Sequence, residues 1–547
     1  MSEWWRGAVI YQIYPRSFQD TNADGVGDLP GIIQRLPYVA ALGVDAIWVC
    51  PFFRSPMDDF GYDIEDYRDV DPLFGTLDDA DRLIAEAHNL GLKIVIDMAL
   101  SHTSIRHRWF QDSRRSTDNS YADWYVWADP RPDGTPPNNW LSMFGGPAWT
   151  WEPRRQQYYF HNFLPSQPDL NLHNPAVQEA LLEECRFWLE RGVDGFRLDA
   201  CNCLTHDRQL RSNPPRPADV PPTEGVQPNN PYNRQLHLYN KSQPETVDFL
   251  RKLRTLSDSY GDILLLAEIA DDDSLKVMQD YAGPGAPLHT AYCFAFLGPT
   301  LETDLIAKAF EAFHNGRRHG WPSWAFSNHD VQRVASRWGG RHVPPEFTKL
   351  LIALLGSLRG TVFLYQGEEL GLPEADVPYE QIQDPYGLNF FPDFPGRDGC
   401  RTPMPWDDND RHAGFSTVDG WLPVPNEHLL RSVGAQNADP DSVLNFTRDF
   451  LAWRKSQPSV IQGDIHFIAT GEPGLIAFVR AHGEERMLAV FNTEERMRWM
   501  PIPRPVRQVL DTLRLPQGRL AGDHIELPAH GCFFALLEPA PHLEPAE

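Results

Sequence analysis

The stretch Asp194–Ala200, which reads DGFRLDA, combines an apolar strand pattern with two charged residues of opposite sign. Arg197 and Asp199 are two residues apart, and alternate residues of a β-strand lie on one face, so the guanidinium and the carboxylate project together. A neighbouring cation lowers the pKa of an aspartate and keeps it charged at neutral pH. Taken alone, the stretch predicts either a reactive carboxylate or a structural ion pair, and it favours neither.

Seven similar apolar segments accompany this strand along the chain. Amphipathic helical windows separate most of them, for instance at 77–90, 175–191, 245–259 and 345–358. Alternation of strands and helices is typical of a parallel sheet with right-handed crossovers, and eight such units favour a closed barrel. We therefore predict an α/β fold, a (β/α)8 TIM barrel. The predicted strands cover residues 8–14, 44–49, 93–98, 194–199, 263–268, 290–296, 322–328 and 361–365.

Two further acidic residues stand at the ends of predicted strands. Glu268 closes the apolar run ILLLAE, and Asp330 follows WAFSNH, where an aromatic strand gives way to a loop. Because parallel strands of a barrel present their carboxyl ends at one mouth, Asp199, Glu268 and Asp330 are predicted to lie close together. Three acids at one mouth favour catalysis over a structural ion pair.

These motifs resemble the signature of the α-amylase superfamily, glycoside hydrolase family 13, which has an FRxDA-type segment on strand four, a glutamate on strand five and an NHD on strand seven. The resemblance implies that Asp199 is the nucleophile, Glu268 the general acid/base and Asp330 a stabiliser of the transition state. It also implies a retaining mechanism through a covalent glucosyl-enzyme. The local sequence agrees, because an apolar strand raises the pKa of Glu268 while Arg197 is expected to keep Asp199 ionised.

Other residues match family positions that bind the sugar. His102 and His329 are expected to donate imidazole N–H groups to sugar hydroxyls, and Tyr62 is expected to stack on the sugar ring. Arg397 resembles the lid arginine that pairs with Asp59 in exo-acting relatives and closes the pocket behind the terminal glucose. The substrate-binding set that the resemblance implies consists of Asp59, Tyr62, His102, Arg197, His329 and Arg397.

A pocket closed at one end predicts exo-action on short substrates. The segment Gln167–Asn171, QPDLN, matches the marker of the oligo-1,6-glucosidase and α-glucosidase branch of the family. Ala200 stands where relatives that favour α-1,6 linkages carry valine, and such a difference in size is worth about 1–3 kcal/mol. We expect a hydrolase that prefers α-1,4 bonds, as in maltose, and that also transfers glucose. A transglucosylase, a sucrose hydrolase or a sucrose isomerase remains open, because these share the glucosyl-enzyme.

The loop Asp20–Asp28, DTNADGVGD, offers oxygen ligands in the spacing of a calcium-binding loop. Position 12, where an EF-hand has a bidentate glutamate, is Gly31, so a related structural site for Ca²⁺ or Mg²⁺ is expected, and no organic cofactor. An Asp-rich solvated turn is the alternative. The predicted ligands are the side chains of Asp20, Asn22, Asp24 and Asp28 and the backbone carbonyl of Val26.

Interruptions of the strand and helix alternation define the predicted domains. The segment after strand three is rich in Trp, Tyr, Pro and Asn and too long for an ordinary loop, which predicts an inserted domain, called domain B in relatives. Alternating apolar patterns near the C-terminus predict an antiparallel β domain. The predicted division gives the barrel 1–103 and 172–462, domain B 104–171, a lid loop 371–430 within the barrel and the C-terminal β domain 463–547.

The composition excludes several classes of partner. The chain has 49 Lys and Arg against 75 Asp and Glu, a net charge of −26, which disfavours nucleic acid and anionic membrane surfaces. Apolar runs stay below the ~18 residues of a membrane span, the N-terminus lacks a signal-peptide pattern, and the odd count of seven cysteines favours reduced thiols. We expect a cytoplasmic monomer or homodimer that acts on a small oligosaccharide.

A binding module without catalytic activity is the alternative from a different functional class. The ectodomains of amino-acid transporter heavy chains resemble the same barrel and serve as partner modules. Those domains have lost the catalytic acids and carry a membrane anchor. Because Asp199, Glu268 and Asp330 are all present, an enzyme is favoured.

Overall fold

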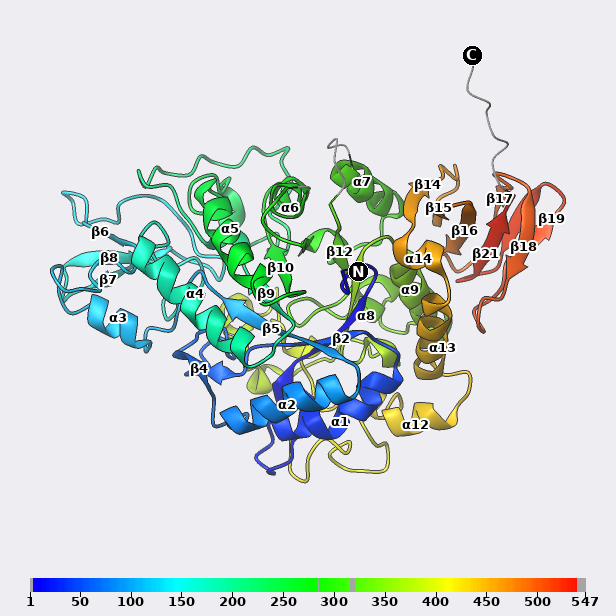
Figure 1. Ribbon diagram of the computed structural model, residues 1–547, viewed down its shortest axis with the longest axis horizontal. Helices are drawn as coiled ribbons and strands as arrows, with labels where there is room; N and C mark the ends of the chain where they lie inside the picture. The colour runs from blue at the N-terminus through cyan, green and yellow to red at the C-terminus, as the bar shows by residue number, and fades with distance from the viewer. Residues whose placement is uncertain (1–2, 284, 315–319, 539–547) are drawn as a thin grey trace, which may run out of the picture.

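The computed structural model describes residues 3–283, 285–314 and 320–538, and its centre is one sheet of eight strands that curls into a barrel (Figure 1). Neighbouring strands pair in parallel in the order β11, β10, β9, β5, β2, β1, β13 and β12. At the two ends of this order, the hydroxyls of Thr290 and Ser323 lie 2.6 Å apart and bring the sheet edges together. The predicted barrel is confirmed.

The observed strands fall within or close to the predicted segments. The main differences are at 322–328, where the strand covers only Ser323–Ala325, and at 290–296, where the strand ends at Cys293 and residues Phe294–Phe296 form a 3-10 turn. The barrel strands are β1 Val9–Ile13, β2 Ala46–Val49, β5 Lys93–Ala99, β9 Gly195–Asp199, β10 Leu264–Ile269, β11 Thr290–Cys293, β12 Ser323–Ala325 and β13 Thr361–Tyr365.

Helices cover the outside of the barrel, with at least one after each strand (Figure 1). Helix α2, Leu77–Asn89, begins at a capping box, in which Thr76 and Asp79 exchange side-chain to backbone hydrogen bonds. Its buried face includes Leu83 and Ile84. The four predicted helical windows are confirmed. The main barrel helices are α1 Leu29–Ala41, α2 Leu77–Asn89, α4 Pro175–Glu190, α5 Glu245–Asp258, α6 Ser274–Ala282, α7 Thr303–His314, α8 Val334–Gly339, α9 Pro345–Ser357 and α13 Val443–Lys455.

The barrel strands are buried on both faces, which explains their continuous apolar sequences. Ile10 and Trp48 belong to a cluster in the barrel interior, together with Phe363. Their strand neighbours Val9 and Ile47 belong instead to the larger core that includes the surrounding helices. Alternation of side chains along each strand therefore fills the barrel and attaches the helices at the same time.

Three long connections leave the barrel, after β5, β9 and β13, and the one after β9 runs to the start of α5 at Glu245. The connection after β5 carries α3 Arg108–Ser113 and a small sheet of order β6, β8, β7 at one side of the molecule (Figure 1), with β6 Trp127–Ala128, β7 Trp149–Glu152 and β8 Gln157–Phe160. The boundaries of domain B stay a prediction. The connection after β13 has little regular structure and includes α10 Pro385–Phe390, the 3-10 turn η7 Asp398–Cys400, α11 Asn426–Leu429 and α12 Val433–Ala438.

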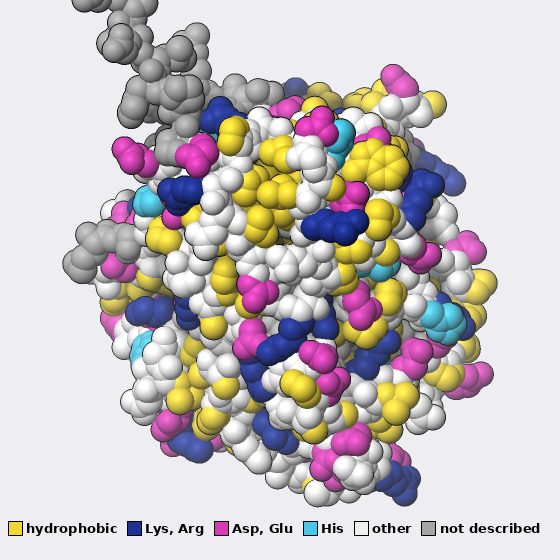
Figure 2. Space-filling model, turned by 90° about the vertical axis from the view of Figure 1, so that its right-hand side faces the viewer, with side chains coloured by type: hydrophobic (Ala, Val, Ile, Leu, Met, Phe, Trp, Pro, Cys, Tyr) yellow, Lys and Arg dark blue, Asp and Glu magenta, His cyan; other side chains and the backbone are white. Residues whose placement is uncertain are grey.

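The predicted C-terminal antiparallel domain is confirmed. Its larger sheet has the order β14, β15, β16, β21, β18, and a smaller sheet β17, β20, β19 packs against it around Leu488, Ile525 and Phe533. Figure 2 views the molecule from this end, where acidic and basic side chains are interspersed. The strands are β14 Asp464–Phe467, β15 Leu475–His482, β16 Glu485–Asn492, β17 Arg498–Pro501, β18 Val506–Leu510, β19 Arg519–Ala521, β20 His524–Leu527 and β21 Cys532–Leu537.

Two expectations from the composition can be compared with the structure. All seven cysteines are buried and free, as predicted. In the part of the chain that the structure describes, no helix combines the length and the apolar character needed to cross a membrane.

Candidate active site

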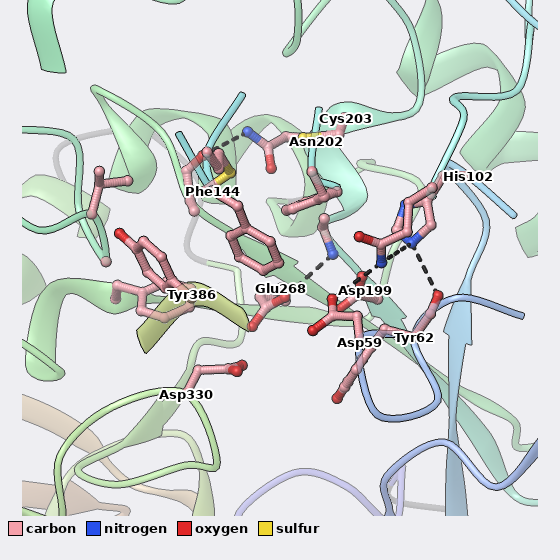
Figure 3. A pocket seen from close by; sticks show the side chains of 18 of the residues that line it. Asp59, Tyr62, His102, Phe144, Asp199, Asn202, Cys203, Glu268, Asp330 and Tyr386 are labelled. Atoms are coloured by element: carbon pink, nitrogen blue, oxygen red, sulfur yellow. Dashed lines mark hydrogen bonds between the residues drawn. The ribbon is translucent and has the colours of Figure 1, made fainter. Parts of the chain in front are cut away.

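Asp199, Glu268 and Asp330 line one cavity at the carboxyl ends of the barrel strands (Figure 3). Asp199 is the last residue of β9, and Glu268 lies near the end of the adjacent, parallel strand β10. Asp330 follows β12 in a loop. The three acids that the sequence singled out are therefore brought together, and the sheet fixes the relative position of the first two.

Arg197 lies fully buried beneath this cavity and is shared by three carboxylates. Its Nη1 is 2.6 Å from Asp199 Oδ1 and 2.6 Å from Asp97 Oδ1, and its Nη2 is 2.5 Å from Glu268 Oε1. Asp97 lies opposite Arg197 in the register of β5 and β9. Asp97 was not predicted as a site residue, although a charged residue inside the apolar strand segment IVIDMA is a signal.

Burial governs the ionisation of the two acids above Arg197. Burial raises the pKa of Asp199 to about 7 and that of Glu268 to about 7, while Arg197 lowers both. The expectation that Arg197 gives Asp199 a net lowered pKa is wrong, because Asp199 loses its water and the guanidinium also serves Asp97 and Glu268. Near neutral pH, one of the two acids therefore holds a proton while the other is ionised.

A second arginine, Arg397, joins carboxylates at the rim of the cavity. Its Nη2 lies 2.9 Å from Asp59 Oδ1 and 2.8 Å from Asp384 Oδ1, and its Nη1 lies 3.1 Å from Asp330 Oδ1. Arg401 Nη2 adds a contact of 2.9 Å to Asp330. Although burial acts to raise it, the pKa of Asp330 is held below its usual range, and these two arginines favour its charged form. The contact between Asp59 and Arg397 that the resemblance implied is present.

The remaining expected sugar-binding residues divide into two groups. Tyr62 and His102 line the cavity, whereas His329 and Arg197 are not among the described residues that do so. The Nε2 of His329 is 2.6 Å from the Tyr62 hydroxyl, and its Nδ1 is 2.7 Å from Gln12 Nε2. Burial lowers the pKa of His102 to about 4 and that of His329 well below its usual value, so both imidazoles are neutral near pH 7. Their contacts with sugar remain predictions.

Ala200 has an unusual backbone conformation next to Asp199. Its φ of 39° and ψ of 46° are left-handed, which is rare for a residue other than glycine. Its N–H points to Glu268 Oε2 at 3.3 Å. The turn that ends β9 thus directs a backbone donor at the second acid, a feature that the sequence did not disclose.

Much of the cavity lining comes from loop residues that were not singled out from the sequence. These loops follow β5, β9, β10, β11 and β13, and loops have no periodic pattern from which contacts can be predicted. The further lining residues are Met143, Phe144, Phe163, Asn202, Cys203, Gly225, Val226, Ala270, Phe294 and Tyr386.

The predicted cation loop uses its acidic side chains for internal hydrogen bonds. Asp20 accepts from the N–H groups of Asn22 at 3.0 Å and Gly25 at 2.9 Å, and Asp28 caps α1 by accepting from Gly31 N at 2.7 Å. Within residues 3–283, 285–314 and 320–538, no group of three or more His, Cys, Asp or Glu is arranged to hold a metal ion. The cation stays a prediction.

The chain is similar to known proteins over most of its length. A family model described as the α-amylase catalytic domain matches residues 12–463. A probable α-glucosidase of Rhizobium meliloti (strain 1021) is 53% identical over 539 residues, which is 98% of this chain and 97% of that protein. An oligo-1,6-glucosidase of Heyndrickxia coagulans is 36% identical over 530 residues, 90% of this chain and 93% of that protein. The solved structure of the α-glucosyl transfer enzyme XgtA has a TM-score of 0.97 at 53% identity and covers 98% of this chain and 100% of its own.

Proposed function

The chain belongs to the α-amylase family of glycoside hydrolases, in its α-glucosidase and oligo-1,6-glucosidase branch, and on that premise we propose that it is a retaining, exo-acting α-glucosidase. Its substrates are short oligosaccharides, from which it releases the non-reducing terminal glucose. It prefers α-1,4 bonds, as in maltose, and also transfers glucose to other sugars.

The contact of Arg397 with both Asp59 and Asp330 carries this proposal. Asp59 and Asp330 both line the cavity that holds Asp199 and Glu268, so the ion bridge spans the cavity beside the reacting groups. A polymer that threads through an open cleft would have to displace this buried bridge. A terminal sugar needs only to enter from the open side, so the bridge favours exo-action.

Near neutral pH the pair Asp199 and Glu268 shares one proton, and this suits a two-step displacement. In the first step, ionised Asp199 forms a bond to the anomeric carbon while Glu268 gives its proton to the departing oxygen. In the second step, Glu268 takes a proton from the attacking water, the bond to Asp199 breaks and glucose leaves. Asp330, held ionised by two arginines, stabilises the positive charge that develops on the sugar in both steps.

A transglucosylase is the second candidate, and the similarity to an α-glucosyl transfer enzyme supports it. It shares the glucosyl-enzyme with the hydrolase and differs in whether a sugar or water takes the glucose. A sucrose hydrolase or sucrose isomerase differs in the leaving group, which is fructose.

A panel of maltose, isomaltose, sucrose, trehalose, nigerose and starch tests the proposal. We expect glucose release from maltose to exceed that from isomaltose, and no release from starch. Rapid hydrolysis of starch would refute the closed rim. If concentrated maltose yields new oligosaccharides with negligible free glucose, the protein is a transglucosylase instead.

We also propose that the loop Asp20–Asp28 binds Ca²⁺ or Mg²⁺. The donor set consists of oxygen atoms, which these cations prefer, and the Asp24 carboxylate retains lone pairs because it accepts only from Val26 N and Asn22 Nδ2. Adding 1 mM Ca²⁺ or Mg²⁺ to EDTA-treated protein should raise the Tm by about 2 °C, since binding stabilises the folded state. Asp24→Asn, which keeps an oxygen for Val26 N, should abolish the shift, whereas equal Tm values with and without cation would refute the site.

The cytoplasmic location and the monomeric or homodimeric state remain predictions.

A further inference from the structure

Tyr292 lies beside Glu268 in the barrel interior. The two residues are partners in the parallel register of β10 and β11, so their side chains project from the same face of the sheet. Tyr292 is 1% exposed and belongs to the interior cluster that includes Trp48 and Phe363. It is not among the described residues that line the cavity, so any part it has in the reaction acts through Glu268.

The Tyr292 hydroxyl has two hydrogen-bonding partners. It donates to Glu268 Oε1 at 3.0 Å and accepts from Arg197 Nη2 at 3.1 Å. Arg197 Nη2 itself lies 2.5 Å from the same Oε1. Burial raises the pKa of Tyr292 well above its usual range, so the hydroxyl keeps its proton and remains a donor at every pH at which the protein is folded.

The two carboxyl oxygens of Glu268 consequently have unlike surroundings. Oε1 faces two donors, a hydroxyl and a guanidinium, whereas Oε2 receives the N–H of Ala200 at a longer 3.3 Å. A proton on Oε1 would meet the hydrogens of both donors, so it is disfavoured there. The proton of Glu268 therefore resides on Oε2.

The chain contains a similar contact outside the cavity. Tyr11, on β1, donates to Glu369 Oε1 at 2.8 Å, and both residues are fully buried. Neither is among the described residues that line the cavity. A hydrogen bond from tyrosine to glutamate can thus serve stability alone, and Tyr11 provides a matched comparison for Tyr292.

We propose that Tyr292 is a positioning residue for proton transfer, which holds Glu268 by Oε1 so that Oε2 gives and takes the proton. This rests on the proposed function, because it assigns an atom to each proton transfer of that reaction. As the bond between the anomeric carbon and the departing oxygen breaks, the proton on Oε2 moves to that oxygen. The carboxylate that remains is stabilised at Oε1 by Tyr292 and Arg197. In the second step, Oε2 takes a proton from the attacking water.

The same hydrogen bond affects the acidity of Glu268. A hydrogen bond donated to a carboxylate favours its charged form, so Tyr292 acts with Arg197, while burial, Asp199 and Asp330 act against them. Without the hydroxyl, Glu268 should be a weaker acid that keeps its proton to higher pH. The charged and titratable groups that face Glu268 are Arg197 and Asp199 on β9, Cys201 after β9, Tyr292 on β11, Asp330 after β12 and Asp97 on β5.

Two glucosyl donors that differ in their need for a proton test the inference. Tyr292→Phe removes the hydroxyl and keeps the ring. The leaving sugar of maltose needs a proton, whereas the fluoride of α-glucosyl fluoride is a weak base and leaves without one. We expect kcat/KM on maltose to fall about tenfold, a part of what general acid catalysis contributes, and kcat/KM on α-glucosyl fluoride to fall less than about twofold. An equal fall for both donors overturns the inference, because lost packing or folding would lower both alike.

The pH profile of kcat/KM on maltose gives the second measurement. Tyr292→Phe should move its alkaline limb upward by about 1 pH unit, because one hydrogen bond to the charged form is lost. Tyr11→Phe removes the matched hydrogen bond and should leave both the ratio between the two donors and the alkaline limb unchanged. An unmoved or lowered limb in Tyr292→Phe overturns the inference, and so does the same pair of changes in Tyr11→Phe. If the wild-type protein releases glucose from neither donor, the proposed function itself fails.

Discussion

Two buried arginines hold the two ends of the active site, and each is shared by three carboxylates. Arg197 lies at the base and Arg397 at the rim. The partners of Arg197 are Asp97, Asp199 and Glu268, and those of Arg397 are Asp59, Asp330 and Asp384.

The two arrangements differ in how the fold produces them. The base is built on three neighbouring strands, β5, β9 and β10, so the register of the sheet fixes its geometry. The rim joins loops, and Arg397 and Asp59 are 338 residues apart in the chain. The base therefore suits the chemistry that a whole family shares, while the rim can vary with its loops and set which substrates enter.

Removing the nucleophile at the base is the largest expected effect. Asp199→Asn should lower kcat/KM on maltose by about 10⁴-fold or more, because no covalent intermediate can form. Asp78→Asn, an exposed change in the first turn of α2, is the control and should retain activity. Near-normal turnover in Asp199→Asn, with contamination excluded by a second preparation, would overturn the mechanism.

Opening the rim should have the next largest effect. Arg397→Ala leaves Asp59 and Asp384 buried without their cation, so we expect kcat/KM on maltose to fall about 100-fold, equivalent to about 2.7 kcal/mol, and the Tm to fall. Relative activity on maltoheptaose should rise, because the cavity is no longer closed. Arg397→Lys keeps a positive charge but not the forked pair of N–H donors. Its kcat/KM on maltose should lie between those of wild type and Arg397→Ala. If maltoheptaose and maltose lose activity equally, the rim does not control substrate length.

The base was largely predictable from the sequence, and the reason is the regularity of strands. Arg197 and Asp199 share a face because they are two residues apart, and Glu268 lies one residue before the end of the adjacent strand. Asp97 could have been found by the same argument from the charged position in β5. What failed was the net direction of the Asp199 pKa, because burial and the sharing of one cation among three acids are properties of the folded molecule.

The rim could be predicted from the sequence to a much smaller extent. The pairing of Asp59 with Arg397 came from family resemblance, since no spacing in the chain relates residues so far apart. Asp384 and Phe144 were missed altogether. Their positions depend on loop conformations, such as the left-handed Gly225, whose packing on Phe294 no periodic pattern encodes.

Substitutions at Ala200, next to Asp199 at the base, should have a smaller effect, and they test what sets the linkage preference. Ala200→Val should raise the activity ratio of isomaltose to maltose about tenfold, because the extra methyl groups narrow the space beside Asp199. Both activities should also fall, since a β-branched residue is strained at a φ of 39°. Ala200→Gly relieves the backbone without adding volume, and should leave the preference for maltose in place. If valine and glycine shift the ratio alike, backbone conformation sets the linkage preference and side-chain volume does not.

The smallest expected effect is on thermal stability. Its pH dependence should have opposite signs for Glu268 at the base and Asp330 at the rim. The folded-state pKa of Glu268 is raised to about 7, above its unfolded value near 4.3, so its contribution to stability falls as the pH rises from about 4 to 7. The folded-state pKa of Asp330 is lowered, so its contribution is present above about pH 4 and is lost in more acidic solution.

Thermal unfolding of two variants that remove these charges measures the difference. Between pH 4 and pH 7, the Tm of Glu268→Gln should rise relative to wild type by about 2–4 °C, because the amide does not ionise. Over the same interval Asp330→Asn should stay below wild type by a nearly constant amount, and the gap should close only below pH 4. If both variants follow the same pH course relative to wild type, Glu268 and Asp330 are not held in opposite states of ionisation, and this contrast between the base and the rim fails.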